Sequence, residues 1–299
     1  MFDAAYGLPK DSDLITKEYL DRFVIEWRFL EIGSEPSTEC TLFGRRLSTP
    51  IMCGGMAFYE HLQEGGAPLF AEGVKAADTV MFIGMSSAEQ LEEVAATGVP
   101  CGRIIKPFED ENLIIENIKH DERMGAIAVA MDIDHTFKRD GSVDDFFGNK
   151  LKVQTRDSLR RYVECSSLPF YPKGVLSVRD AEICAEAGVA GIIISHHQAM
   201  FPESVPPLKV LPKIREAVGD KLEIIVDCGF YNGYDCFKAL ALGADGVFVA
   251  RPLRDIFKEK GAEGVTAKIN LMTSELKACL ARTGSTDIHH IDPEVIVEL

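Results

Sequence analysis

The sequence lacks the features that mark membrane, secreted and nucleic-acid-binding proteins. No segment offers the roughly 18 consecutive apolar residues that span a bilayer, and residues 1–20 are acidic, without the apolar run of a secretion signal. Asp and Glu number 47 against 32 Lys and Arg, which gives a net charge of −15. A general nucleic-acid binder is not expected, because phosphate backbones require a basic face.

The eight cysteines form no CxxC pair, and several of them lie in or beside apolar runs. We therefore expect no disulfide framework, no metal site and a cytoplasmic setting. The sequence also has no low-complexity segment and no recognisable linker. Although 299 residues would suffice for two domains, α/β barrels of this length are common, and we expect one domain over residues 1–299.

Short apolar runs alternate with amphipathic stretches along the chain, and continuous apolar runs are typical of strands that are buried on both faces. The runs are Pro50–Gly54, Thr79–Gly84, Gly102–Lys106, Gly125–Asp132, Phe170–Gly174, Ala190–Ser195, Leu222–Asp227 and Asp245–Ala250. Eight such units predict a closed (β/α)8 TIM barrel, with an open doubly wound sheet as the alternative.

Helices are predicted between the apolar runs by periodicity and by end signals. Ser87–Thr97 and Ser177–Ala187 each begin with a capping serine, and Gly188 ends the second. A further helix is predicted over Gly233–Leu242. Residues 1–46 would form an N-terminal cover, and residues 263–283 a C-terminal helix packed outside the barrel.

The segment 135–152 is polar, contains glycines and has no clean period. It follows the fourth predicted strand, on the face where barrel active sites lie. Both an active-site lid and an ordinary surface excursion are compatible with this pattern.

Polar side chains follow the predicted strands at the end where barrel enzymes place their chemistry. His197 is the candidate base, because imidazole exchanges protons near neutral pH, and Asp132 is a candidate carboxylate partner. Lys173 lies in an apolar context, where a lysine is costly unless it meets an anion. A structural histidine and a structural salt bridge are the alternatives for His197 and Lys173.

The seventh and eighth strand ends predict a phosphate site. Gly229 and Gly233 flank a turn into a helix, and Arg251 begins the last helix. Backbone N–H groups at a helix start, together with a guanidinium group, bind phosphate well. The alternative is that Arg251 pairs with an acidic residue on the barrel rim.

Two stretches, PKGVLSVRDAEICAEAGVAGIIISHH and IIVDCGFYNGYDCFKALALGADGVFVARP, resemble the FMN-dependent 2-hydroxy-acid oxidase and dehydrogenase family. That family includes glycolate oxidase and lactate oxidase. The resemblance covers roughly residues 40–285 and is strongest over 170–255. It implies FMN as cofactor, a small-molecule substrate and a homo-oligomer, with the homotetramer as the family's frequent form.

The resemblance also implies roles for matched positions. His197 corresponds to the catalytic histidine, Asp132 to its paired aspartate, and Lys173 to a lysine beside flavin N1 and O2. The positions implied to contact FMN are Gly55, Met56, Ala57, Gly84, Lys106, Lys173, Ser195, Asp227, Gly229, Ala250 and Arg251.

The sequence departs from the family pattern at positions that bind the substrate in the family. Met200 stands where the family has an arginine that binds the substrate carboxylate, and Phe108 stands at a substrate tyrosine. On the loop after the fourth strand, Lys138 or Arg139 would supply the second carboxylate-binding arginine, and Tyr6 corresponds loosely to an N-terminal substrate tyrosine. A buried carboxylate needs a charged partner, so a larger or less anionic substrate than lactate is expected.

The resulting hypothesis is an FMN-dependent oxidoreductase that oxidises a hydroxy-acid-like substrate. His197 would remove a proton while hydride reaches flavin N5. The electron acceptor is left open among O2, a quinone and another protein. Two alternatives are an FMN-dependent non-redox isomerase or lyase, and a non-catalytic barrel that binds a phosphorylated ligand.

Overall fold

A computed structural model describes residues 12–30, 35–197 and 200–299, and eight of its strands close into a parallel barrel. Strand β13 pairs with β4 in parallel register, with Val247 opposite Ile51, and this pairing closes the ring. The barrel strands are β4 (Ile51–Met56), β5 (Met81–Gly84), β6 (Cys101–Ile105), β7 (Val129–Asp132), β10 (Phe170–Val175), β11 (Gly191–Ile194), β12 (Glu223–Val226) and β13 (Gly246–Val249). The predicted TIM barrel is therefore confirmed, and the open sheet is excluded.

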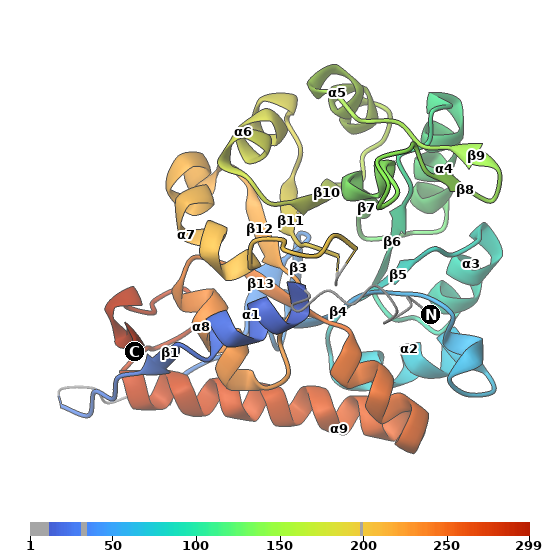
Figure 1. The fold of residues 1–299 in the computed structure, drawn as a ribbon. Coiled ribbons are helices and arrows are strands. Elements are labelled where there is room, and N and C mark those ends of the chain that lie inside the picture. The colour runs from blue at the N-terminus through green and yellow to red at the C-terminus, as the bar shows by residue number, and fades with distance from the viewer. Residues whose placement is uncertain (1–11, 31–34, 198–199) are drawn as a thin grey trace.

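Helices surround the barrel in chain order (Figure 1). They are α2 (Gly66–Ala76), α3 (Ala88–Ala96), α4 (Glu111–Arg123), α5 (Arg156–Glu164), α6 (Val178–Ala187), α7 (Pro207–Val218) and α8 (Gly233–Ala241). The predicted end signals are in place. Ser87 and Ser177 accept hydrogen bonds from the backbone N–H groups of Gln90 and Asp180, and Gly188 ends α6 with φ 81°.

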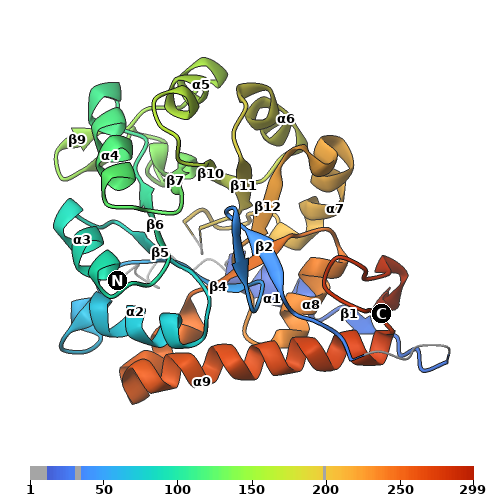
Figure 2. The ribbon, with the colours of Figure 1, turned by 180° about the vertical axis from the view of Figure 1, so that it is seen from behind.

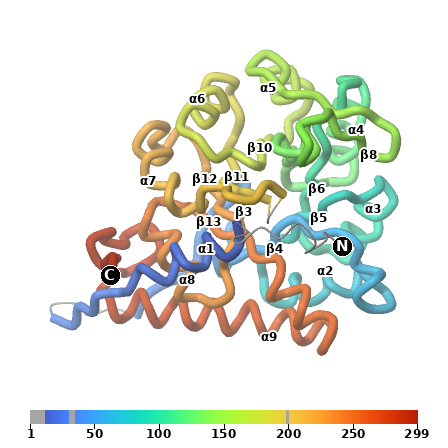
Figure 3. Tube along the Cα trace, in the orientation of Figure 1, coloured from blue at the N-terminus to red at the C-terminus, as the bar shows by residue number. Residues whose placement is uncertain are grey.

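The last helix, α9 (Arg251–Thr283), is longer than the predicted span 263–283. Gly261 interrupts it with φ 62° and ψ −152°, a conformation that glycine adopts most readily. The part before Gly261 completes the eighth βα unit, and the part after it runs along the outside of the molecule (Figure 3). The predicted C-terminal helix is therefore the second half of a kinked element.

The N-terminal cover contacts both ends of the barrel. Helix α1 (Ser12–Leu20) lies over the end seen in Figure 1, and the hairpin of β2 (Cys40–Leu42) and β3 (Arg45–Leu47) lies over the other end (Figure 2). Between them, β1 (Phe23–Ile25) pairs in antiparallel fashion with β14 (Ile296–Glu298). Residues 1–11, which include Tyr6, lie outside the described residues.

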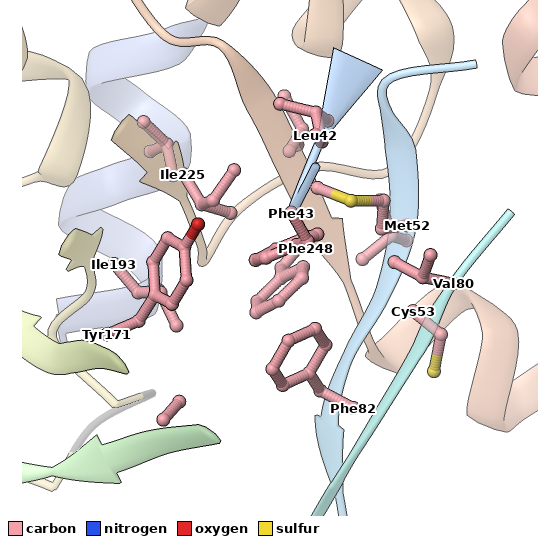
Figure 4. Packing of buried hydrophobic residues seen from close by; sticks show 14 of the residues in the cluster. Leu42, Phe43, Met52, Cys53, Val80, Phe82, Tyr171, Ile193, Ile225 and Phe248 are labelled. Carbon is pink, nitrogen blue, oxygen red and sulfur yellow. The ribbon is translucent and has the colours of Figure 1, made fainter. Parts of the chain in front are cut away.

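The hairpin closes the barrel bottom with an aromatic cluster (Figure 4). Phe43, at the hairpin turn, lies with its ring centroid 5.0 Å from those of both Phe82 and Tyr171. Phe82 also contacts Phe248 at 5.1 Å. Glycine at position 102 makes room for this cluster, because a Cβ there would approach Phe82 Cε1 to 2.5 Å. Each buried aromatic side chain contributes roughly 1.5–3 kcal/mol to stability.

The segment 135–152 contains short regular elements and packs onto the chain that follows β6. It begins in the 3-10 turn η3 (Ile133–Thr136) and continues into the hairpin of β8 (Asp145–Phe146) and β9 (Asn149–Lys150). Backbone N–H groups of Glu109 and Lys152 donate to Lys150 and Pro107, each at 2.8 Å. The assignment of this segment as a lid stays a prediction.

Across residues 12–30, 35–197 and 200–299, no helix has the length and apolar character needed to cross a membrane.

Candidate active site

The mouth of the barrel holds one buried carboxylate between two buried ammonium groups. In the parallel pairing of β10 with β7, Lys173 lies opposite Asp132. Lys173 Nζ donates to Asp132 Oδ1 at 3.1 Å, and Lys106 Nζ donates to Oδ2 at 2.7 Å. Burial alone would raise the pKa of Asp132, but Lys106 and Lys173 lower it well below its usual range. Asp132 is therefore held as an anion with both oxygens paired.

His197 follows β11 and reaches the same cluster. Its backbone lies in the left-handed region with φ 50°, which is uncommon for a residue with a side chain and is frequent at functional sites. Its Nδ1 lies 3.2 Å from both carboxylate oxygens of Asp134 and 3.5 Å from Asp132 Oδ1. Asp134 is therefore the nearer carboxylate partner, although the sequence had suggested Asp132. Lys173 Nζ lies 3.1 Å from the same Nδ1.

A second imidazole faces His197 from η3. Nε2 of His135 lies 3.1 Å from Nε2 of His197, and the ring centroids are 4.3 Å apart. Burial, followed by the charges of His197 and Lys106, lowers the pKa of His135 to about 3. Asp134 and His135 follow the fourth predicted strand end in the sequence, but the sequence analysis assigns neither of them a role. The signal was the polar string directly after Asp132.

One group of three side chains in the mouth has the spacing of metal ligands. Single ligand atoms of Asp132, His135 and His197 lie within 4.8 Å of one another. Both Asp132 oxygens, however, already accept from Lys106 and Lys173. The ammonium groups satisfy this carboxylate and repel a cation, so we assign no metal here.

The ends of β11 to β13 form a cleft suited to an anion. Ser195 Oγ donates to Asp227 Oδ2 at 3.1 Å, which fixes the end of β12. The chain then turns at Gly229, with φ 93°, where a Cβ would approach Thr16 Cγ2 to 2.7 Å. Helix α9 begins at Arg251, and no side chain caps its N-terminus at Ala250. This helix start lies beside a cleft lined by residues 227–231, Phe248 and residues 250–252.

Arg251 also pairs with an acid of the cover. Its guanidinium group donates to Asp13 of α1 and, at 3.3 Å, to Tyr231 Oη. The predicted phosphate partner and the alternative rim salt bridge thus involve the same side chain. An incoming phosphate would have to share Arg251 with Asp13 or displace it.

The ends of β4 and β5 complete the mouth with small residues. Gly84 lies against Gly55, since a Cβ on it would stand 3.6 Å from the Gly55 carbonyl carbon. Met56 is the last residue of β4, and Ala57 follows it directly. His196 Nδ1 and Ser86 Oγ, both near the mouth, are buried and find no hydrogen-bond partner in the described part of the chain. The orphaned polar atoms and the uncapped start of α9 together fit a polar, phosphorylated cofactor.

The predicted substrate residues fall into two separate cavities. Arg139 and Met200 meet, because Arg139 Nε donates to the Met200 carbonyl at 3.3 Å. Both line a cavity of about 510 Å³ with Asp134, Phe137, Lys138, Gly141, Leu176, His196, Phe201 and Ser204. Phe108 lines a different cavity of about 260 Å³, beside Lys106, Ser86 and Phe146. Phe108 and Met200, which the resemblance assigns to the substrate, therefore line different cavities, and their shared role in substrate binding stays a prediction.

A closed barrel with an uncapped helix start and a lysine, carboxylate and imidazole cluster at its mouth is the arrangement of a (β/α)8 enzyme that works next to a phosphorylated cofactor. The chain belongs to the FMN-dependent dehydrogenase family, whose model matches residues 14–150 and 141–298. FMN is its cofactor, and the chain is an FMN-dependent oxidoreductase. The resemblance seen in the sequence is confirmed.

Individual relatives agree with this assignment. Glycolate oxidase 3 of Arabidopsis thaliana is 31% identical over 90% of this chain and 83% of its own length. The 2-hydroxyacid oxidase of Dictyostelium discoideum is 29% identical over 88% of this chain and 76% of its own length. A mandelate oxidase variant solved with 2-hydroxy-phenylacetamide superposes with a TM-score of 0.87 at 25% identity, covering 95% of this chain and 89% of its own.

Proposed function

We propose that this protein oxidises the carbinol carbon of a hydroxy acid, or of its amide or ester, that carries a sizeable apolar group. The main support for this proposal is the position of the His197 imidazole, which contacts Asp134 and Lys173 at the mouth of a barrel of the FMN-dependent family. Bound FMN supplies a two-electron acceptor for the hydride. The chain's own residues supply cofactor binding, proton removal and substrate selection.

The phosphate end of FMN is assigned to the cleft of Gly229, Ala250 and Arg251, where first-turn N–H groups of α9 and a guanidinium group are available. The flavin end is assigned to the opposite side, over Gly55 and Gly84. Met56, Ala57, Ser195 and Asp227 would complete the contacts. Lys173 and Lys106 place positive charge at this end, which stabilises negative charge that develops during reduction.

Proton removal is assigned to the imidazole cluster. An ionised Asp134 stabilises the imidazolium that forms when His197 gains a proton. The pKa of Asp134 is consistent with this role, because His197 and Lys173 lower it although burial raises it. Asp132 adds a second negative charge 3.5 Å from Nδ1.

Substrate selection is assigned to the cavity of about 510 Å³. Its walls combine apolar side chains of Phe137, Leu176, Met200 and Phe201 with the cationic Lys138 and Arg139. Met200 offers no donor to a carboxylate, so an amide, an ester or a large aromatic acid suits this wall better than a small anion. Relatives named as glycolate and mandelate oxidases span that range of substrate size.

The test is anaerobic bleaching of the FMN-loaded protein with glycolate, mandelate and 2-hydroxy-phenylacetamide. We expect the two aromatic probes to reduce the flavin at least about 10-fold faster than glycolate, because burial of the ring favours them. In Met200→Arg the preference should move toward the acids, and His197→Asn should abolish bleaching while FMN stays bound. Fastest bleaching by glycolate, or no bleaching by any probe, would refute the proposal.

A further inference from the structure

A cavity of about 260 Å³ extends from the mouth toward α3, α4 and the β8–β9 hairpin, which lie side by side in both ribbon views (Figures 1 and 2). Side chains alternate along β6, and Gly102 faces the barrel interior, where a Cβ would meet Phe82. Arg103 therefore faces outward, and its bond to Asp121 of α4 agrees with this direction. The outer part of the cavity thus lies between the barrel wall and the helix layer.

Arg103 is held by α4 so that one of its nitrogen atoms is left over. The side chain is only 3% exposed. Nε donates to Asp121 Oδ2 at 3.0 Å, and Nη2 lies 2.7 Å from Asp121 Oδ1 and donates to Asn117 Oδ1 at 2.8 Å. Among the described residues, Nη1 has no hydrogen-bond partner, although Arg103 lines the cavity. The two N–H groups of Nη1 are therefore fixed in place and available to a ligand.

Two further donors line the same cavity. Ser86 Oγ is buried and finds no hydrogen-bond partner in the described ranges. Lys106, at the inner end, spends one N–H on Asp132 at 2.7 Å, and its Nζ lies 5.8 Å from the Phe146 ring centroid. No Asp or Glu of residues 12–30, 35–197 and 200–299 lines this cavity, in a chain with a net charge of −15. Unused donors without a competing carboxylate favour an anion.

The remaining wall of the cavity is mainly apolar. The rings of Phe108 and Phe146 have centroids 6.3 Å apart and are inclined at 46°. Ile105 and Leu113 continue this surface. Apolar walls with a few fixed polar groups are typical of sites for small molecules. An inorganic anion would leave the aromatic wall in contact with water, so the better ligand has an anionic end and an apolar body.

We propose that this cavity binds a small aromatic carboxylate, with the carboxylate at Arg103 and Ser86 and the ring against Phe108 and Phe146. The Nη1 N–H groups and the Ser86 hydroxyl match the two carboxylate oxygens. The carboxylate belongs either to a separate acid or to the far end of a substrate, and the recognising chemistry is the same. The binding site does not depend on the reaction proposed above.

The first experiment is a calorimetric titration of the FMN-loaded protein with benzoate and with benzamide, its uncharged counterpart. Benzoate should bind at least about 10-fold tighter, because its hydrogen bonds are charge-assisted. Arg103→Lys keeps a cation for Asp121 but loses Nη1, and should weaken benzoate binding by roughly 10–100-fold. Arg161→Lys, which alters an exposed two-nitrogen pair with Glu111, is the matched control and should bind benzoate like the wild type.

A second variant separates loss of the site from damage to the fold. Ser86→Phe leaves the Arg103–Asp121 pair in place and fills the cavity, so benzoate binding should be lost while the urea midpoint stays near the wild-type value. Equal affinity for benzoate and benzamide would overturn the proposal. So would wild-type benzoate affinity in both Arg103→Lys and Ser86→Phe, because benzoate would then bind elsewhere.

Inhibition kinetics distinguish the two sources of the carboxylate. If benzoate competes with mandelate for FMN reduction, and the competition disappears in Arg103→Lys, the cavity holds the far end of the substrate. If benzoate lowers the maximal rate without competing, and Arg103→Lys abolishes this effect, the site takes a separate acid. If no probe bleaches the flavin while the calorimetric result holds, the proposed function fails and the carboxylate site stands.

Discussion

Two carboxylates at opposite ends of the barrel, the buried Asp132 and the half-buried Glu223, behave in opposite ways. Asp132 at the mouth faces two ammonium groups, and its pKa lies well below the usual range. Glu223 at the bottom accepts from Tyr171 Oη at 3.0 Å and from the Phe43 N–H at 3.2 Å. Burial raises the pKa of Glu223 to about 7, because these neutral donors offset it only partly. The charge of the partners, and not burial alone, therefore determines the pKa of each carboxylate. Cationic partners keep the carboxylate at the mouth ionised, whereas the carboxylate at the bottom has only neutral partners and serves the packing of the fold.

The largest expected effect is at the mouth. Lys173→Met removes the buried ammonium group that joins Asp132 to the flavin end, and FMN reduction should slow by roughly 10²–10³-fold. FMN should still bind, because the phosphate cleft is unchanged. Stopped-flow reduction measures the rate. Lys277→Met, which breaks an exposed pair with Glu35, is the matched control and should stay within about twofold of the wild type. If Lys173→Met reduced FMN as fast as the wild type, the charged cluster at the mouth would have no role in the reaction, and the functional contrast with the bottom of the barrel would be lost.

The next largest effect concerns the pH dependence of the free energy of unfolding, which depends on Glu223 at the bottom of the barrel. The folded pKa of Glu223 is raised to about 7, so its protonated form stabilises the fold in acid. That stabilisation is lost as the pH rises from about 4, where the unfolded carboxyl ionises, through about 7. Glu223→Gln keeps the acceptor oxygen and should remove this slope. At pH 8 it should be more stable than the wild type by at most about 3 kcal/mol.

Urea titrations of both proteins at pH 5 and pH 8 measure the effect of Glu223→Gln. FMN affinity should not change, because Glu223 lies at the far end of the barrel. A wild-type stability that is flat between these pH values would show that Glu223 is ionised in the folded state. The contrast with Asp132 would then be lost.

A smaller effect is expected at the rim. Arg251→Met removes the charged donor from the phosphate cleft and should weaken FMN binding by roughly 10–100-fold. The FMN affinity of Arg251→Lys should lie between those of the wild type and Arg251→Met, because lysine keeps the positive charge but lacks the planar guanidinium group that binds phosphate through two N–H groups. Quenching of FMN fluorescence measures the affinity, and the urea midpoint of the FMN-free chain should stay near the wild-type value. Equal affinity in Arg251→Met would place the phosphate elsewhere.

The smallest effect has the opposite sign. Asp13 holds Arg251 in an ion pair, so its carboxylate competes with the FMN phosphate for the same guanidinium group. Asp13→Asn should tighten FMN binding by roughly 2–5-fold, an effect that salt reduces. Fluorescence titration at low and high ionic strength measures it. Weaker binding in Asp13→Asn would mean that Asp13 orients Arg251 for the phosphate instead of competing with it.

The sequence predicted the scaffold well, because buried parallel strands read as apolar runs and helix ends carry chemical signals. The errors are at boundaries. The run Gly125–Asp132 was predicted as one strand, but β7 begins only at Val129. Residues before it reach the barrel through a single backbone bond, from the Ile127 N–H to the Cys101 carbonyl at 2.9 Å. Hydrophobicity alone does not distinguish such an entry segment from a paired strand.

The site was predictable only where it lies on strands. Lys173 and Asp132 are neighbours because of parallel register, which the barrel dictates. Asp134 and His135 meet His197 because η3 curls back over the mouth, and no periodic pattern encodes that turn. The position of Phe108 was likewise not predictable from the sequence, because it depends on an isolated antiparallel bridge to Leu151, which lies far away along the chain.

The pairing of β1 with β14 has a consequence for the order of assembly. Phe23 lies opposite Glu298, so this small sheet joins segments from the two ends of the described chain. At ribosomal rates of about 5–20 residues per second, β1 waits tens of seconds for its partner. Helix α1 precedes β1 directly, but its Asp13, Thr16 and Leu20 bond to Arg251, His196 and Lys238, which are all made before β14. The cover can therefore dock in two steps, with α1 on the barrel first and β1 paired last.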